Sequence, residues 1–293
     1  MSATRQRRAS PPPRPPRRRP PAKRSGGGGK RSELLTRVLV GVPLAILAIA
    51  FVDLGGIPWA VLMIVASVLC MSELYQMLAR WRPIQMVGFA SAVAMVIVAR
   101  YGNARDVLEV AMITIPATFL AVALAQQRGM ATVRIAGTLL GIWWIGLGFA
   151  HAELLRGVPH GGSVIIDVML GTFLGDAGAY LGGRLFGRRP LAPEISPNKT
   201  VEGLFCGMFV AILAVFVAGQ YQPWMTKGDA LLLGVAVAVL APIGDLFESM
   251  VKRDAGVKDS GRIFGPHGGA LDRLDAIIFT IVAGYYVWVG ILH

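Results

Sequence analysis

Charged residues and cysteines are both scarce in this sequence. Asp, Glu, Lys and Arg together make up 16% of its 293 residues, whereas hydrophobic residues make up 54%. So little charge does not fit a solvated globular surface and indicates a chain embedded in lipid. Only two cysteines occur, Cys70 and Cys206, both inside apolar runs and neither with a Cys or His partner at a metal-ligand spacing. The sequence therefore favours neither a disulfide nor a zinc site.

Acidic residues are absent from the first 31 positions. This segment holds 11 of the 29 Lys and Arg residues and none of the 17 Asp and Glu residues, so most of the net charge of +12 lies there. The rest of the chain, with 18 basic and 17 acidic residues, is close to neutral, which argues against a nucleic-acid partner. Runs of Pro, Arg and Gly predict a disordered tail over residues 1–31. We interpret the tail as a solvated arm that fixes membrane topology rather than as a specific binding arm.

Long apolar stretches, in contrast, recur through the rest of the chain. A hydrocarbon core about 30 Å thick needs roughly 20 helical residues to cross it. Nine stretches approach this length, at residues 34–52, 57–78, 84–100, 107–125, 135–152, 164–183, 201–219, 229–248 and 271–291. We therefore expect an all-α fold, a polytopic membrane helical bundle of about nine transmembrane helices surrounded by membrane lipids.

The distribution of Lys and Arg predicts how this bundle is inserted. If the N-terminus is cytoplasmic, 25 basic residues fall on the inner side and only four, Arg100, Arg105, Arg156 and Lys227, fall on the outer side. Cytoplasmic loops of membrane proteins hold most of the Lys and Arg residues. We therefore expect a cytoplasmic N-terminus, with the longest polar cytoplasmic connections at 184–200 and 249–270.

Six acidic residues lie at or near membrane depth, where charge is costly and by default indicates function. They are Glu73, Asp176, Asp245, Glu248, Asp272 and Asp275. If the eighth expected helix continues past residue 248, Asp245, Ser249 and Lys252 share one of its faces. Asp272 and Asp275 share a face at the start of the last helix. Two helix ends would then direct carboxylates toward one region near the inner surface.

Clustered carboxylates repel one another unless a cation lies between them. Ligands that are all oxygen favour Mg²⁺ or Mn²⁺ over zinc. The same connection supplies more basic residues than these acids can pair with, namely Lys252, Arg253, Lys258, Arg262 and Arg273. A metal together with surplus base is what a polyphosphate substrate requires. From spacing alone, an equally good interpretation is that the bases enforce topology and the acids pair with them inside the bundle.

Residues 249–275, SMVKRDAGVKDSGRIFGPHGGALDRLD, place polar residues and glycines at set spacings. This stretch, here named the signature segment, closely resembles the signature of the phosphatidate cytidylyltransferase family, also called CDP-diacylglycerol synthases. Its matching positions are Ser249, Lys252, Arg253, Lys258, Asp259, Gly261, His267, Gly268, Gly269, Asp272, Arg273 and Asp275. Residues 175–187 and 196–203 look similar to further segments of that family, whereas the first half of the chain shares only hydropathy with it. The sequence departs from the family pattern at Ala270, at Gly265–Pro266 and at Asn198.

The resemblance implies transfer of a cytidylyl group from CTP to phosphatidic acid, at the cytoplasmic side of the inner (plasma) membrane. The products would be CDP-diacylglycerol and pyrophosphate. We expect the phosphatidate phosphate to attack the α-phosphorus of CTP in line, without a covalent enzyme intermediate. The resemblance also suggests a homodimer.

The same resemblance assigns roles to residues. The expected metal, Mg²⁺ or Mn²⁺, would be held by Asp245 and Asp272, with Asp275 and Asp176 behind them. The predicted catalytic residues are Asp245, Asp272, Asp275 and Lys252. The predicted substrate-binding residues are Lys199, Thr200, Glu202, Ser249, Arg253, Lys258, Asp259, His267, Gly268, Gly269 and Arg273.

This interpretation divides the chain into three parts. They are the basic tail at 1–31, N-terminal transmembrane helices at 32–160, and a C-terminal catalytic transmembrane region at 161–293 that includes the signature segment. In the N-terminal part we interpret Glu73 and Tyr75 as an isolated interior polar pair rather than as part of a lipid passage.

Three motifs also have purely structural interpretations. Ser196 and Pro197 fit the N-cap and the first turn of a helix, although the resemblance favours nucleotide contact by the residues that follow. Small residues at four-residue steps, Gly171, Gly175, Ala179, Gly183 and Gly187, form a stripe suited to close helix packing. A second Pro-His-Gly-Gly, at 159–162, falls in an outer loop without an acidic cluster, and we interpret it as a coincidence.

Three alternatives belong to other classes of protein. A polytopic transporter would use intramembrane carboxylates as an ion path, but here the charges gather on one side of the membrane. Another metal-dependent lipid phosphotransferase, a CDP-alcohol phosphotransferase, would need the DGxxAR arrangement, which this sequence lacks. A noncatalytic scaffold would not need acids and bases arranged around the Gly-Pro-His-Gly-Gly at 265–269.

Overall fold

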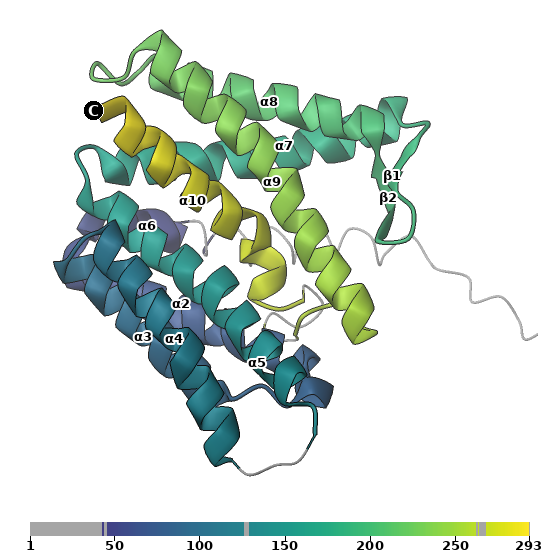
Figure 1. Cartoon of the computed structure of the whole chain (residues 1–293). Coiled ribbons are helices and arrows are strands. Elements are labelled where there is room, and N and C mark those ends of the chain that lie inside the picture. The colour runs from purple at the N-terminus through teal and green to yellow at the C-terminus, as the bar shows by residue number, and fades with distance from the viewer. Residues whose placement is uncertain (1–42, 44–45, 126–128, 262, 264–267, 293) are drawn as a thin grey trace, which may run out of the picture. The chain divides into compact units, whose positions relative to one another are not determined.

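The described part of the protein is almost entirely helical. The computed structural model describes residues 43, 46–125, 129–261, 263 and 268–292, so the predicted tail at 1–31 lies outside the described residues (Figure 1). The helices are α2 (Gly56–Met77), α3 (Gln85–Tyr101), α4 (Ala104–Leu124), α5 (Ala131–Leu140), α6 (Leu147–Gly157), α7 (Gly161–Phe186), α8 (Val201–Gly219), α9 (Lys227–Ala255) and α10 (Leu271–Leu292). A short 3-10 helix, η1 (Ala79–Trp81), follows α2, and a π-helical segment, η2 (Gly141–Gly146), joins α5 to α6.

Seven helical segments in the described residues are long and apolar enough to cross a membrane, as expected of a multi-pass membrane protein. They are Gly56–Met77, Ala104–Leu124, Ala131–Gly157, Gly161–Phe186, Val201–Gly219, Lys227–Ala255 and Leu271–Leu292. The stretch expected at 84–100 forms α3, an apolar helix of 17 residues that is shorter than these. The first expected span, 34–52, lies mostly outside the described residues, although 46–54 is helical. The described chain therefore accounts for seven of the nine expected spans.

A small β-hairpin interrupts the helices between α7 and α8 (Figure 1). Strand β1 (Pro190–Ala192) pairs antiparallel with β2 (Ser196–Thr200), with Pro190 opposite Thr200. The expectation of an all-α chain is wrong at this point, and so is the prediction that Ser196 is an N-cap. Residues 196–200 are extended because they pair with β1, and the N-cap of α8 is Thr200, whose Oγ1 accepts a hydrogen bond from the Gly203 amide at 3.1 Å.

The expected stripe of small residues packs α7 closely against α8. A Cβ added to Gly207 of α8 would lie 2.8 Å from both the Ala179 Cβ and the Gly175 carbonyl oxygen of α7. A Cβ added to Gly203 would lie 2.7 Å from the Ala179 carbonyl oxygen. The structural interpretation of the stripe is thus confirmed, because a side chain at either position would push the two backbones apart. This contact fixes the part of α7 that contains Asp176.

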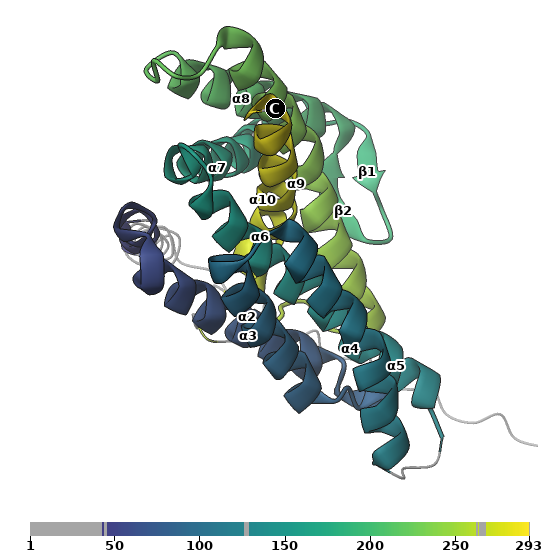
Figure 2. The same cartoon turned by 60° about the vertical axis from the view of Figure 1, so that its left-hand side comes forward.

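Helices α9 and α10 lie side by side, as both views show (Figures 1 and 2). A Cβ added to Gly244 of α9 would lie 2.9 Å from the Asp275 carbonyl oxygen and 3.0 Å from the Ala276 Cα of α10. Helix α9 continues to Ala255 and ends at Gly256, whose φ of 75° is the left-handed conformation that glycine accepts readily. Asp245, Ser249 and Lys252 therefore lie on one continuous helix, which meets the condition for their sharing a face.

Candidate active site

Asp272, in the first turn of α10, connects three parts of the signature segment. Its Oδ1 accepts a hydrogen bond from the Lys252 ammonium at 2.7 Å. Its Oδ2 accepts hydrogen bonds from the Ser260 amide at 2.9 Å and the Gly269 amide at 2.8 Å, and lies 2.9 Å from the Ser260 hydroxyl. A carboxylate offers about four lone-pair sites, so these donors use most of its capacity. Asp272 thereby ties the end of α9, the loop at Ser260 and the start of α10 together.

Glu73 of α2 reaches the same segment from the N-terminal half of the chain. Its carboxylate accepts hydrogen bonds from the Ala270 amide at 3.0 Å and the Leu271 amide at 2.9 Å, and its Oε2 lies 2.9 Å from the Ser260 hydroxyl. Tyr75 instead donates a hydrogen bond to the Thr138 carbonyl at 2.8 Å. The interpretation of Glu73 and Tyr75 as an isolated pair is therefore wrong, because each has a partner far away in the sequence.

Lys252 is shared between two carboxylates. It forms an ion pair with Glu248, one helical turn earlier on α9, and a second ion pair with Asp272. The exposed fractions are 13% for Lys252, 1% for Glu248 and 12% for Asp272, so all three side chains are shielded. The acid-base pairing that spacing alone left open is thus present at Lys252.

A second ion pair joins the hairpin to α9. Lys199, in β2, pairs with Asp245, and both side chains are partly exposed, at 28% and 34%. Asp176 of α7 interacts electrostatically with both partners of this pair. Asp275, buried in α10, interacts with Asp245 and Asp176 as well. Three helices and the hairpin therefore bring several carboxylates and the ammonium groups of Lys199 and Lys252 to the same end of the bundle.

The described residues contain no group of three or more His, Cys, Asp or Glu side chains close enough to hold a metal ion. Protein side chains alone therefore do not form a complete metal site in the described residues. Magnesium ions, however, are commonly held by one or two carboxylates together with water and the phosphates of a substrate. One or two of the carboxylates of Asp176, Asp245 and Asp275 fit that arrangement better than Asp272, whose oxygens already accept several hydrogen bonds.

The sequence profile of the cytidylyltransferase family matches residues 35–290. The chain belongs to this family. A phosphatidate cytidylyltransferase of Staphylococcus aureus is 33% identical over 238 residues, which cover 78% of this chain and 88% of the relative. A protein of the same name from Staphylococcus epidermidis is 34% identical over 203 residues, 66% of this chain and 76% of the relative. One from Mycobacterium bovis is 36% identical over 168 residues, 56% of this chain and 53% of the relative.

Membership of the cytidylyltransferase family confirms the resemblance found in the signature segment and makes the chain an enzyme. The match also includes α2 and the following helices, so the similarity extends beyond the C-terminal motifs. The first half of the chain therefore shares more with the cytidylyltransferases than the hydropathy alone that we expected.

In this cytidylyltransferase, some of the residues predicted to bind substrate form hydrogen bonds within the protein. The Arg253 guanidinium donates a hydrogen bond from Nε to the Ile195 carbonyl at 3.0 Å, which ties the hairpin to α9. Glu202 accepts hydrogen bonds from the Arg188 amide at 3.0 Å and the Arg189 amide at 3.2 Å, at the approach to the hairpin. Together with Thr200 as the cap of α8, these contacts hold Lys199 near Asp245.

The remaining predicted residues occupy the end of α9, the loop and the start of α10. Ser249 is half-buried one turn after Asp245, and the side chains of Lys258, Asp259 and Arg273 are exposed. Gly268 and Gly269 are buried, and Gly268 has a φ of 83°. His267 lies outside the described residues. The sequence analysis named Glu73 among the acidic residues at membrane depth but missed its contact with the signature segment, although a carboxylate in an apolar stretch already indicated an interior partner.

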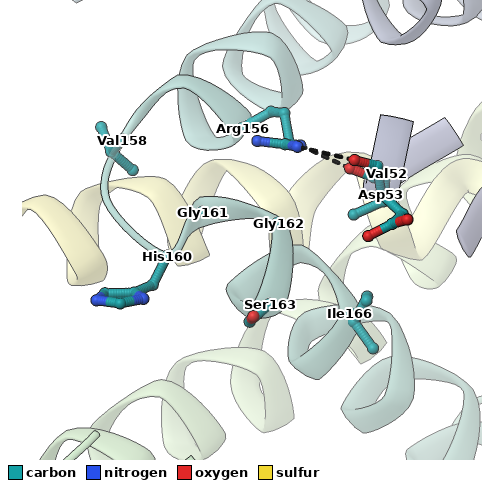
Figure 3. A pocket seen from close by; sticks show the side chains of 9 residues that line it. All are labelled: Val52, Asp53, Arg156, Val158, His160, Gly161, Gly162, Ser163 and Ile166. Carbon is teal, nitrogen blue, oxygen red and sulfur yellow. Dashed lines mark hydrogen bonds between the residues drawn. The ribbon is translucent and has the colours of Figure 1, made fainter. Parts of the chain in front are cut away.

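The other Pro-His-Gly-Gly lies at the opposite end of α7, beside a cavity of about 270 Å³ (Figure 3). Arg156 donates hydrogen bonds to the carbonyls of Val52 at 2.7 Å and Asp53 at 3.3 Å, at the end of a preceding helical segment. The His160 ring stacks on Trp224 with centroids 4.2 Å apart. Asp53 is the only acidic side chain that lines this cavity in the described residues, whereas several carboxylates gather around Lys199 and Lys252 at the other end.

Proposed function

We propose that this cytidylyltransferase transfers a cytidylyl group from CTP to phosphatidic acid, forming CDP-diacylglycerol and pyrophosphate for phospholipid synthesis. The observation that supports this proposal most strongly is the group of acids and bases around the Lys199–Asp245 and Lys252–Asp272 pairs, at one end of an apolar helical bundle. A site at such an end can meet a soluble polyanion and a lipid that stays in the bilayer. The names of the bacterial relatives agree with this pair of substrates.

The proposal includes a topology. The chain would cross the inner membrane about nine times, with its N-terminus and the signature segment on the cytoplasmic side. The excess of Lys and Arg in the connections on that side supports this orientation. CTP would then reach the site from the cytoplasm, and phosphatidic acid would reach it from the inner leaflet.

The chemical step is a single displacement. An oxygen of the phosphatidate phosphate forms a bond to the α-phosphorus of CTP, the bond from that phosphorus to the oxygen bridging toward the β-phosphorus breaks, and pyrophosphate leaves. Lys199 and Lys252 provide positive charge where the transferring and leaving oxygens become more negative. Bound Mg²⁺ or Mn²⁺ would neutralise polyphosphate charge, held by one or two of the carboxylates of Asp176, Asp245 and Asp275 together with the substrate phosphates. Asp272 orients Lys252 through their ion pair.

The test uses the full-length protein purified in detergent, with CTP, Mg²⁺ and phosphatidic acid. We expect lipid-soluble CDP-diacylglycerol to form with phosphatidic acid and no product to form when diacylglycerol replaces it, because diacylglycerol lacks the attacking phosphate. A preparation that is folded by its thermal transition and yet forms no CDP-diacylglycerol would refute the proposal. Light scattering of the same preparation tests the predicted homodimer.

A further inference from the structure

The start of α10 is capped by a side chain from a distant helix. The first backbone amides of a helix have no partner within that helix, and a negative charge near them is favourable. Here the Ala270 and Leu271 amides donate to Glu73, a residue of α2 nearly 200 positions earlier in the sequence. The Glu73 side chain is 2% exposed, so this contact is shielded from water.

Ser260 connects this carboxylate to Asp272. The Ser260 hydroxyl lies 2.9 Å from an oxygen of Glu73 and 2.9 Å from an oxygen of Asp272, and the Ser260 amide donates to Asp272. A hydroxyl has one proton to donate, so it serves one carboxylate at a time. A movement of Glu73 would therefore displace Ser260 and, through Ser260, Asp272 and Lys252.

The signature segment is closely fitted around the Glu73 carboxylate. A Cβ added to Gly261 or to Gly269 would overlap the side-chain oxygens of Glu73. Both glycines belong to the signature segment, and both therefore allow its backbone to approach the carboxylate. The signature segment therefore contacts the Glu73 carboxylate at two places, Gly261 and Gly269.

A second residue of the same region contacts the end of α9. Arg80, in η1, donates a hydrogen bond to the Asp254 carbonyl in the last turn of α9. The last carbonyls of a helix lack partners within that helix, and positive charge is favourable there. Glu73 and Arg80 are about two helical turns apart in the sequence. Between them, α2 and η1 thus supply a negative group to the start of α10 and a positive group to the end of α9.

We propose that Glu73, assisted by Arg80, is a positioning residue of this cytidylyltransferase. It fixes the distance between the end of α9 and the start of α10 and thereby orients Lys252 and Asp272 for cytidylyl transfer. In this proposal Glu73 does not touch the substrate. The expected effect on turnover rests on the proposed function. The N-terminal helices would accordingly contribute to turnover by holding the signature segment.

The test compares Glu73→Gln and Glu73→Ala with a matched control, Glu153→Gln. Glu153, in α6, is also 2% exposed and has an ion-pair partner, Arg100 at 3.7 Å, but it does not contact the signature segment in the described structure. Displacing catalytic groups by about 1 Å can lower a rate about 100-fold. We expect Glu73→Ala to lower kcat by about that factor, with the KM for CTP changed much less.

The conservative variant and the control complete this comparison. Glu73→Gln keeps one acceptor oxygen and should retain a larger part of the wild-type kcat than Glu73→Ala. Glu153→Gln should keep the wild-type kcat per folded molecule, even if its thermal transition falls as far as that of the Glu73 variants. Equal kcat losses in Glu73→Gln and Glu153→Gln would overturn the proposal, because they would indicate a general loss of stability.

Hydrogen exchange provides a measurement that does not depend on the reaction. In Glu73→Gln we expect faster exchange at the amides of Ser260, Gly269, Ala270 and Leu271, with exchange in α7 and α8 unchanged. Uniformly faster exchange, or unchanged exchange at these four amides, would contradict the positioning role. If the wild-type protein forms no CDP-diacylglycerol, the proposed function fails, while the exchange result still decides whether Glu73 fixes the segment.

Arg80→Gln serves as a second variant if the Glu73 variants do not fold. Arg80 is exposed, so its replacement should leave the thermal transition nearly unchanged. We expect a several-fold loss of kcat and faster exchange at the end of α9. A wild-type kcat together with unchanged exchange in Arg80→Gln would remove its part of the proposal.

Discussion

Two glycine pairs with the same preceding residues, Pro-His, occupy opposite ends of this protein and have different surroundings. At 161–162 the pair begins α7, beside Arg156 and the ring stack of His160 on Trp224. At 268–269 the pair precedes α10, and the Gly269 amide donates to Asp272 beside Lys252. A glycine at each end allows a close approach, of Gly161 to the Leu155 carbonyl and of Gly269 to the Glu73 carboxylate, so the two ends differ in their neighbouring charged side chains. We expect these side chains to decide which end binds a polyanion.

The largest expected difference between the two ends comes from Asp245→Asn. This change removes a carboxylate while keeping its volume, and turnover should fall on the order of 100- to 1000-fold. The Lys199–Asp245 pair is about one-third exposed, and such pairs contribute about 0–1 kcal/mol, so the free energy of unfolding should change little. The measurement is CDP-diacylglycerol formation at saturating substrates, alongside a thermal transition.

A matched control for this variant is Arg105→Gln, which breaks the exposed Arg105–Glu109 pair of α4. Turnover of Arg105→Gln should equal that of the wild type. Full activity of Asp245→Asn would remove Asp245 from the site.

The next largest effect is expected for Asp272→Asn, because this change disturbs both structure and turnover. The Asp272–Lys252 pair is shielded, and breaking a buried pair costs about 3–5 kcal/mol. Lys252 keeps Glu248 as a partner, so we expect a loss of stability nearer to about 3 kcal/mol. Turnover should fall about 100-fold, because Lys252 loses the partner that orients it. Chemical denaturation in detergent measures the loss of stability, and formation of CDP-diacylglycerol measures turnover.

Asp229→Asn provides the comparison from the other end of the bundle. Asp229 lies in the first turn of α9, as Asp272 does in α10, and forms a capping box with Thr226. Its replacement should lower stability by about 1 kcal/mol and leave turnover unchanged. Wild-type turnover in Asp272→Asn would contradict the comparison, because Asp272 would then affect turnover no more than Asp229 does.

A smaller effect is expected for Gly207→Ala, which tests how helix packing supports the site. The added methyl group would lie 2.8 Å from Ala179 and would separate α7 from α8. Overpacking of this kind costs about 1–3 kcal/mol, and a several-fold fall in turnover should accompany it because Asp176 moves with α7. Gly290→Ala, where an added methyl group meets no other atom within 4 Å, should change neither quantity. Identical behaviour of the two variants would contradict the packing account.

The smallest effect is expected for His160→Asn. This change removes the ring that stacks on Trp224 but retains a residue type that accepts the left-handed backbone at position 160, where φ is 59°. Stability should fall by about 1 kcal/mol, and turnover should not change. A large loss of activity would place His160 near the chemistry and reverse the comparison between the two ends.

The sequence predicted the parts of the fold that depend on local pattern. Long apolar stretches indicated the seven spans, and four-residue spacing of small residues indicated the close packing of α7. The sequence did not by itself predict the continuation of α9 past residue 248, because the apolar stretch ends there. The hairpin was missed because Ser196 and Pro197 fit a helix start as well as a short strand. Only pairing with β1 distinguishes the two.

In the candidate site, too, local spacing predicted some features, whereas contacts between distant residues could not be predicted. The spacing of Asp245, Lys252 and Asp272 directed attention to the end of the bundle where the Lys199–Asp245 and Lys252–Asp272 pairs lie. The role of Glu73 could not be predicted, because its contact with residues 260–271 joins distant parts of the chain and leaves no periodic signal in either.

The central claim is that the acids and bases around Asp245 and Lys252 transfer the cytidylyl group of CTP to phosphatidic acid. Incubation of the purified protein with CTP labelled at either the α- or the γ-phosphate tests it most directly. The account predicts that α-label appears in the lipid and γ-label appears in pyrophosphate, and that both conversions are lost in Asp245→Asn. Transfer of γ-label to the lipid, or retention of both labels in CTP by folded wild-type protein, would contradict it.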